Sequence, residues 1–263
     1  MISMIVCIKQ VLDPEVPPSS FKIDPEAKRV ILPRGTLPVL NPFDENALEA
    51  ALKIKDTQDA HITVISMGRN LDEPVLRASL AAGADDLILL EDDAFEDFDS
   101  YSTAYTLATA IKKVGEYDLI LCGREAADTD AGQVGSGIAE ILGIPSITVG
   151  RKIEASNGKV RVERVVSDGY EVIEASMPVL VTAGGEIGLL REPSVEGFMA
   201  ADEKPITVWN AQELGVDLPQ LKRTNLLKLF SPVHEVRCQM IEGDSLEEAA
   251  ENLALKLREA KII

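Results

Sequence analysis

Short apolar runs alternate with amphipathic segments of helical period between residues 4 and 183. Buried strands are predicted at 4–9, 61–67, 86–90, 117–122, 146–149 and 178–183. Helices are predicted from 41–44 onward, from 72–74 to Gly83, and over 100–113 and 133–142. Strands that are apolar throughout have both faces covered, and strand–helix alternation is typical of βαβ units. The pattern predicts a doubly wound α/β fold with a mostly parallel sheet.

The pattern changes after Gly150. Segments 151–155, 159–167 and 170–175 alternate between polar and apolar residues, with Asn157-Gly158 and Asp168-Gly169 between them as hairpin turns. They predict an antiparallel meander, half exposed. Two short runs around Asp24-Pro25 predict a small hairpin. The glycine- and proline-rich stretch from Gly184 to Pro205 is expected to be loop-like, and 246–261 is predicted as an amphipathic helix.

Composition narrows the function classes. With 263 residues and 46% hydrophobic content, the chain has one or two domains with a large core. The net charge of −18 argues against nucleic acid and anionic membrane as partners. Three cysteines without a C-x-x-C pattern indicate neither a disulfide framework nor a zinc site. No stretch reaches the roughly 18 apolar residues that span a membrane, and no signal peptide is recognised, so the cytoplasm is the expected compartment.

The candidate binding segments are those that directly follow predicted strands, because ligands of open parallel sheets bind at the carboxyl ends of the strands. The segments are 7–9, 67–69, 122–124 and the loop before Gln133. The glycine-rich stretch up to Gly137 opens a helix, where backbone N–H groups and the helix dipole favour a phosphate. Asp128 and Asp130 suit ribose hydroxyls or the structuring of the loop. An ordinary helix start with small residues for packing is the alternative, and the standard dinucleotide and P-loop motifs are absent.

Other reactive residue types are expected to have structural roles. Cys7 and Cys122 suit small core residues at strand ends. His61 and His234 suit structural or solvated positions, so no catalytic residue is predicted. The acidic run from Asp85 to Asp99 has eight carboxylates and no Lys or Arg. Its spacing matches no calcium loop, which favours a solvated loop over a metal site.

Six segments in order carry a resemblance to a known family. They are Val6–Lys9, Asn41–Asp44, Arg77–Asp85, Asp128–Gly135, Glu192-Pro193 with Met199–Ala201, and Leu214–Asp217. Over nearly its whole length the chain resembles the β subunits of electron-transfer flavoproteins. The resemblance implies a Rossmann-like, adenine-nucleotide-binding fold and a heterodimer with an α subunit. It implies AMP in simple members and a whole FAD in electron-bifurcating ones.

The resemblance also implies which residues bind the cofactor. These are Cys7, Asn41, Pro42, Phe43, Asp44, Met67, Gly123, Asp128, Thr129, Asp130, Ala131, Gly132, Gln133, Val134, Gly135 and Ser136. Three of the segments end predicted parallel strands, and the amides of 133–137 suit a pyrophosphate. Ala131-Gly132 depart from the Thr-Ala expected in the family, which removes a hydroxyl near the phosphate.

The patterns at 38–44 and Asp128-x-Asp130-x-x-Gln133-Val134-Gly135 resemble the bifurcating branch more. In that branch the β-bound FAD accepts a hydride from NADH. One electron goes to ferredoxin and the other passes through the α-subunit FAD to a partner flavin dehydrogenase. The subunit is then no enzyme alone and is catalytic only within an NADH:ferredoxin/dehydrogenase complex.

The resemblance assigns 184–205 to docking on a dehydrogenase. Val195 is the expected anchor, with Phe198 and Met199 beside it. The family's lysine cluster is replaced by Asp202 and Glu203, with only Lys204 left. This suggests a different or permanently bound partner, of lactate dehydrogenase or acyl/enoyl-CoA type. Residues 1–230 are expected to form the nucleotide-binding domain, and 231–263 an arm on the α subunit or on its own domain.

Three other functions stay open from the residues. One is a non-bifurcating β subunit that holds structural AMP. Another is a regulatory module that senses adenine nucleotides, which has no need of the 184–205 segment. The third is a nucleotide-dependent ligase or hydrolase, which needs a phosphate-binding lysine or a catalytic base near the Gln133 loop, where Arg124 is the obvious candidate.

Overall fold

The computed structural model describes residues 1–33, 35–96, 98–217, 221, 223–232 and 238–263, so His234 lies outside the described residues. The chain forms two compact units. The first comprises Met1–Lys22 with Val30–Leu227, and the second Ile23–Arg29 with Lys228–Ile263. Among the described residues, no helix is long and apolar enough to cross a membrane.

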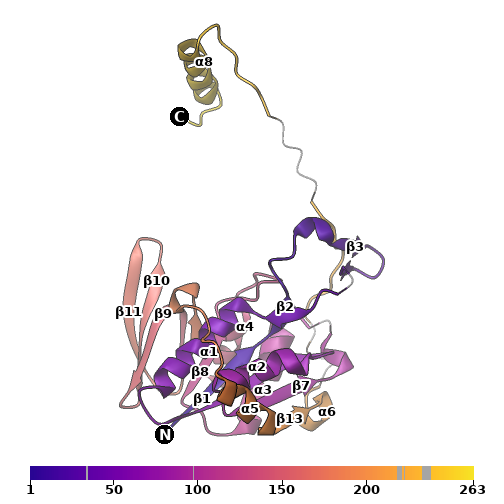
Figure 1. Cartoon of the computed structure of the whole chain (residues 1–263), viewed down its shortest axis with the longest axis vertical. Helices are drawn as coiled ribbons and strands as arrows, with labels where there is room; N and C mark the ends of the chain where they lie inside the picture. Colours follow the sequence, from indigo (N-terminus) through magenta and orange to yellow (C-terminus); the bar gives the residue numbers. More distant parts are fainter. Residues whose placement is uncertain (34, 97, 218–220, 222, 233–237) are drawn as a thin grey trace. The chain divides into compact units, whose positions relative to one another are not determined.

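A nine-stranded sheet forms the centre of the first unit, in the order β11-β10-β9-β12-β8-β1-β6-β7-β13 (Figure 1). The strands β12, β8, β1, β6, β7 and β13 are mutually parallel, as is the β9–β12 pair. β9, β10 and β11 pair antiparallel. The bounds are β1 Ile2–Ile8, β6 Ala60–Gly68, β7 Asp86–Glu91, β8 Leu119–Gly123, β9 Ser146–Ser156, β10 Lys159–Val166, β11 Gly169–Ser176, β12 Val179–Ala183 and β13 Ile206–Trp209.

Helices cover both faces of this sheet (Figure 1). The first face packs α1 (Pro42–Lys55), α2 (Glu73–Ala82) and α5 (Val195–Glu203), and the second packs α3 (Ser100–Val114), α4 (Val134–Leu142) and α6 (Ala211–Leu214). Successive residues of β1 alternate between them, since Met4 and Val6 face the first layer and Ile5 and Cys7 the second. The predicted α/β fold with a mostly parallel sheet is confirmed.

Smaller elements complete the chain. Two two-stranded sheets form outside the main sheet, one from β2 (Gln10–Leu12) and β5 (Pro38–Leu40), the other from β3 (Lys22–Asp24) and β4 (Arg29–Ile31). Short 3₁₀ turns lie at Pro18–Ser20, Asp93–Phe95 and Gly185–Ile187. The helix α8 (Leu246–Glu259) lies in the second unit and has no buried residue. The predicted small hairpin and the predicted C-terminal helix are both confirmed.

Two predictions of local structure are wrong. The strands expected at 146–149 and 151–155 are one strand, β9, which bends where Val149 has a φ of 57°. At Gly150 the backbone of β9 lies close to the Val162 side chain of β10, since an added Cβ would lie 2.9 Å from it. The stretch expected to be loop-like contains α5, which Ser194 caps by accepting a bond from the Gly197 N–H. Its prolines lie outside the helix, so they delimit it.

Candidate functional site

The centre of the sheet has the strand order β7-β6-β1-β8-β12, in which the chain reverses direction of growth between β1 and β8. In open α/β sheets such a reversal leaves a crevice at the carboxyl ends of the two strands, and ligands bind there. Cys7 and Cys122 lie opposite each other at these ends. The edge formed by the ends of β1 and β8, the start of α1 and the loop 124–133 is therefore the candidate site.

Asp44, in the first turn of α1, joins the two strand ends. Its carboxylate accepts hydrogen bonds from the Lys9 N–H at 2.8 Å and from the Gly123 N–H at 2.9 Å. Burial raises the pKa of Asp44 to about 7, although these bonds and Asn41 oppose the rise. An added Cβ at Gly123 would lie 2.5 Å from the Asp44 carboxylate. Only glycine therefore lets α1 begin this close to β8.

Asn41 fixes the loop that follows β8. Its side-chain amide donates to the Glu125 carbonyl at 2.8 Å and accepts from the Ala127 N–H at 3.0 Å. Its own N–H donates to the Lys9 carbonyl. Asn41 is 1% exposed, so these bonds form away from water, where satisfied polar groups rigidify a site.

The start of α4 differs from every other helix that the structure describes. The helices α2, α3, α5, α6 and α8 begin at a side-chain cap, and α1 has two acids in its first turn. α4 has neither a side-chain cap nor an acid there. Its first N–H groups and the positive end of its dipole are thus left for another partner, and an anion such as a phosphate suits them.

Two basic residues border this helix start. The Lys9 Nζ lies 2.7 Å from the Asp128 carboxylate, so the charge of that aspartate is compensated. The guanidinium of Arg124 lies 4.4 Å from the centre of the Phe43 ring and 2.7 Å from the Glu125 carboxylate. Together these contacts reduce the repulsion that acidic residues of the loop would exert on a phosphate.

Comparison with known proteins decides the family. A family model described as "Electron transfer flavoprotein domain" matches residues 30–214. The electron transfer flavoprotein subunit beta of Thermoanaerobacterium thermosaccharolyticum is 40% identical, covering 99% of this chain and all of the relative. The chain belongs to the electron transfer flavoprotein family. It aligns end to end with β subunits of that family, and its function is electron transfer.

Other relatives are named for the complexes in which they act. Subunit CarD of the caffeyl-CoA reductase–Etf complex of Acetobacterium woodii is 42% identical over 99% of both chains. The acryloyl-CoA reductase electron transfer subunit gamma of Anaerotignum propionicum is 35% identical over 98% of both chains. Both are similar to this electron transfer flavoprotein chain over its whole length.

The structure brings most of the predicted cofactor residues to one edge. Asn41, Pro42, Phe43 and Asp44 open α1, Cys7 and Gly123 end β1 and β8, and Met67 lies at the end of the adjacent β6. The stretch 128–136 runs from the loop into α4. Contact with a nucleotide stays a prediction for each of them. Both carboxylate oxygens of Asp44 and the side-chain amide of Asn41 already bond to the chain, so these two residues shape the edge.

Gly132 explains the departure from the family's loop pattern. It has a φ of 60°, a left-handed conformation that glycine adopts without strain, and Asp130 before it has a φ of 48°. An added Cβ at Gly132 would lie 3.4 Å from the Arg124 carbonyl. Glycine at position 132 therefore lets the loop take this left-handed conformation beside Arg124.

Lys9 and Arg124 lie in the predicted strand-end segments 7–9 and 122–124, but the sequence did not predict that Lys9 pairs with Asp128 or that Arg124 contacts Phe43 and Glu125. Lys9 and Arg124 each follow the last residue of a strand that borders the crevice. That position is the signal that selected both segments, because ligands of open parallel sheets bind at the carboxyl ends of the strands. Cys7 and Cys122 are buried free thiols, as expected for core residues, and burial together with Cys7 raises the pKa of Cys122.

The remaining predicted residues lie elsewhere. His61, at the start of β6, bonds Asp86 at 2.7 Å and has a structural role, as predicted. The acidic run is more structured than the predicted solvated loop: Asp92 and Asp99 cap helices, and Arg69 pairs with Asp93 and Glu96. Asp97 lies outside the described residues. Among those described, no group of three potential ligands could hold a metal ion.

The three predicted docking residues share α5. Val195, Phe198 and Met199 are 72%, 56% and 69% exposed. They lie on a helix and not on the predicted loop, so their spacing is that of one exposed helical turn. Docking on a partner stays a prediction for them.

Proposed function

We propose that this chain is the β subunit of a heterodimer with an α subunit and binds FAD at the edge between β1 and β8. The uncapped start of α4 carries the proposal, because its free N–H groups suit a pyrophosphate. Compensation of Asp128 by Lys9 supports it. A flavin bound there would supply the redox chemistry, taking a hydride from NADH and passing electrons on singly.

In this proposal the residues of the chain bind the cofactor and orient it. The N–H groups of Val134, Gly135 and Ser136 would hold the pyrophosphate, while Asp130 lies exposed on the loop beside the helix start. Gly135 packs α4 against β12, since an added Cβ would lie 2.7 Å from Thr182. This packing places the helix start at the strand ends, where binding sites of this fold class lie.

We propose an electron-bifurcating role, with NADH as donor and ferredoxin as one acceptor. The other acceptor is a flavin-dependent dehydrogenase, docked at α5. The names of two relatives, caffeyl-CoA reductase and acryloyl-CoA reductase, favour a partner of the enoyl-CoA type over a lactate dehydrogenase. A β subunit with structural AMP is the second candidate, because AMP needs the same phosphate site. The cytoplasm stays a prediction of the sequence analysis.

Cofactor extraction from the co-expressed heterodimer tests the proposal. Two flavins per dimer, with NADH-driven ferredoxin reduction in the presence of the acceptor dehydrogenase, support bifurcation. One flavin and one AMP per dimer support the simple transfer type. A colourless protein with bound ATP would contradict both.

The site itself is tested by Lys9→Met. Uncompensated Asp128 would repel the phosphates, and we expect about tenfold weaker retention of the β-bound nucleotide on dialysis. Lys112→Met, on the exposed side of α3, removes the same charge and serves as control. The double variant Lys9→Met/Asp128→Asn should regain retention. Unchanged retention in Lys9→Met would place the nucleotide elsewhere.

A further inference from the structure

The exposed part of α5 carries one sign of charge. Between Glu192 and Glu203 the chain has four acids, Glu192, Glu196, Asp202 and Glu203, and no Lys or Arg. All four are exposed and lie around the exposed apolar Val195, Phe198 and Met199. An apolar centre with a charged rim is the usual arrangement of a protein interface.

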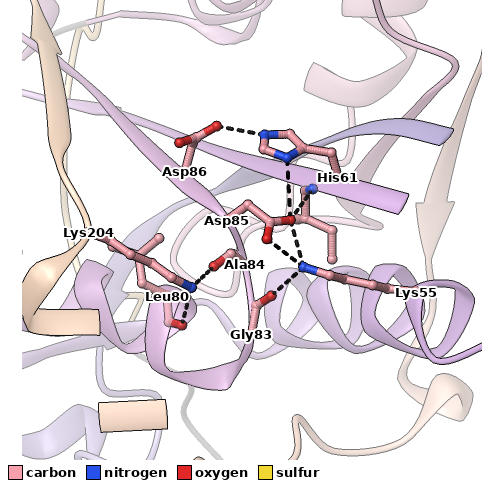
Figure 2. A network of polar contacts seen from close by, with 9 residues as sticks. Lys55, His61, Leu80, Gly83, Ala84, Asp85, Asp86 and Lys204 are labelled. Carbon is pink, nitrogen blue, oxygen red and sulfur yellow. Dashed lines mark hydrogen bonds and ion pairs between the residues drawn. The ribbon is translucent and has the colours of Figure 1, made fainter. Parts of the chain in front are cut away.

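The lysine that follows the helix is turned inward. Lys204 Nζ donates to the Ala84 and Leu80 carbonyls at the end of α2, as Figure 2 shows. Burial lowers the pKa of Lys204, and Asp85 and Asp86 oppose that effect. His61 contacts both aspartates, and Lys55 lies 2.6 Å from Asp85 (Figure 2). Lys204 therefore anchors the helix and is occupied within the protein.

Two neighbouring arginines are held by the protein as well. Arg77 of α2 donates to the Ala201 carbonyl at 2.7 Å and pairs with Glu73 at 2.7 Å. Arg191 pairs with Glu49 at 3.0 Å and with Asp56 at 2.8 Å. These internal pairs compensate both guanidinium groups, so the charge offered by α5 is negative.

Helix α5 is also fixed in place. An added Cβ at Gly197 would lie 2.5 Å from the Ala81 carbonyl, so the two helix backbones touch at this residue. Arg77 and Lys204 bind across the same contact. A helix held this way loses little further conformational entropy when a partner binds.

We propose that α5 fits a partner surface in which an apolar pocket for Val195, Phe198 and Met199 is bordered by lysine and arginine side chains. This rests on the proposed docking role of α5 and adds the chemistry of the partner. Basic rim residues would attract the four acids and, at longer range, the chain's net charge of −18. Charge complementarity of this kind raises association rates and excludes partners with acidic docking surfaces.

The test uses the flavin-reduced heterodimer and the acceptor flavoprotein purified from the source cells by its capacity to take electrons from this heterodimer. For Asp202→Lys/Glu203→Lys we expect the KM for the acceptor to rise about tenfold, with kcat and flavin content unchanged. Glu116→Lys/Asp168→Lys makes the same change of net charge on exposed loops away from α5 and should leave KM within about twofold.

The acceptor is then modified in turn. Acetylation of its lysines should raise KM about tenfold for the unmodified heterodimer and far less for Asp202→Lys/Glu203→Lys, because the paired charges are already lost. Amidation of its carboxylates should have little effect. A lower KM in the charge-reversal variant, or an effect of amidation alone, would overturn the proposed polarity.

Val195→Asp separates the two proposals. A raised KM in Val195→Asp together with an unchanged KM in the charge-reversal variant keeps α5 as docking helix and rejects the basic rim. An unchanged KM in Val195→Asp removes docking from α5 and with it the inference, while the flavin content still reports on the nucleotide site.

Discussion

Helices α5 and α8 both carry exposed apolar side chains, and they differ in what holds them. α5 is bound to α2 through Arg77, Gly197 and Lys204. α8 has no buried residue, and its Leu246 is 87% exposed. A helix held by its own domain keeps its place without a partner, whereas a helix without buried contacts gains stability only from what covers it. We therefore expect α5 to be ordered in the free chain and α8 to depend on the α subunit.

The segment before α5 strengthens this contrast. Three residues of α1 and Asp56, which directly follows it, bind this segment: Asn46 donates to the Gly188 carbonyl, Lys53 to the Ile187 carbonyl, and Glu49 and Asp56 accept from Arg191. Hydrogen bonds to Asp56 and Glu49 raise the pKa of Arg191, which stays charged. Polar contacts thus add to the apolar packing of Ile187 and Leu190 in holding this segment.

The largest effect is expected from Glu49→Ala. This carboxylate is 5% exposed and pairs with Arg191, so its loss should reduce the free energy of unfolding by about 3 kcal/mol. Urea unfolding of the heterodimer measures it. Asp56→Ala removes the other, exposed carboxylate that pairs with Arg191, and it should reduce the free energy of unfolding by under about 1 kcal/mol. Equal costs for the two variants would show that polar contacts on α1 do not hold the segment.

Gly197→Ala comes next. Its new methyl group would collide with the Ala81 carbonyl, so we expect a loss of about 2 kcal/mol and faster hydrogen exchange across 195–203. Gly185→Ala, where an added Cβ meets nothing within 4 Å, should change neither. If α5 stays protected from hydrogen exchange in Gly197→Ala, its contact with α2 is not what distinguishes it from α8.

Asp99 binds the chain at residues 223 and 224, shortly before the part of the second unit that begins at Lys228. It caps α3 and also accepts from the Arg223 and Thr224 N–H groups. Burial raises its pKa, but the bonds from Ser102, Arg223 and Thr224 outweigh this and hold the pKa well below 3.8. The stabilisation is therefore present above pH 3.8 and is lost as the pH falls through the lower folded-state pKa.

We expect Asp99→Asn to lose about 1 kcal/mol at pH 7, because these bonds are largely exposed. The difference from the natural chain should shrink as the pH falls below about 4. Unfolding curves between pH 7 and pH 2 measure it. A difference that stays constant with pH would mean that the carboxylate charge does not hold residues 223 and 224.

The smallest effect is expected from Leu253→Ala in α8. Leu253 is 47% exposed, so the isolated chain should lose under about 0.5 kcal/mol. If the α subunit covers this helix, the same change should weaken heterodimer formation about tenfold, as titration calorimetry can measure. A loss in the isolated chain as large as that of Gly197→Ala would show that α8 is already packed.

Sequence patterns predicted the central sheet well because its strands are continuous apolar runs with helices between them. They failed at α5, since Gly197 reads as a helix breaker until the Ala81 carbonyl beneath it is seen. They also missed β13, which lies at the edge of the sheet and pairs with β7. At the site, glycine spacing pointed to α4, but Lys9 pairs with Asp128 across 119 residues, and no local pattern reveals such a contact.

Helix α1 leaves little freedom for sequence change. Nine of its 14 residues are buried, its first turn joins β1 to β8, and its polar side chains bind the segment that leads into α5. A substitution in α1 would disturb either the edge between β1 and β8 or the segment that leads into α5. The exposed side chains Val195, Phe198 and Met199 of α5 do not link other elements in this way. On the proposed docking role of α5, we therefore expect that this protein can be retargeted to a new electron acceptor by varying residues 195–203 at their exposed positions, with α1 left intact.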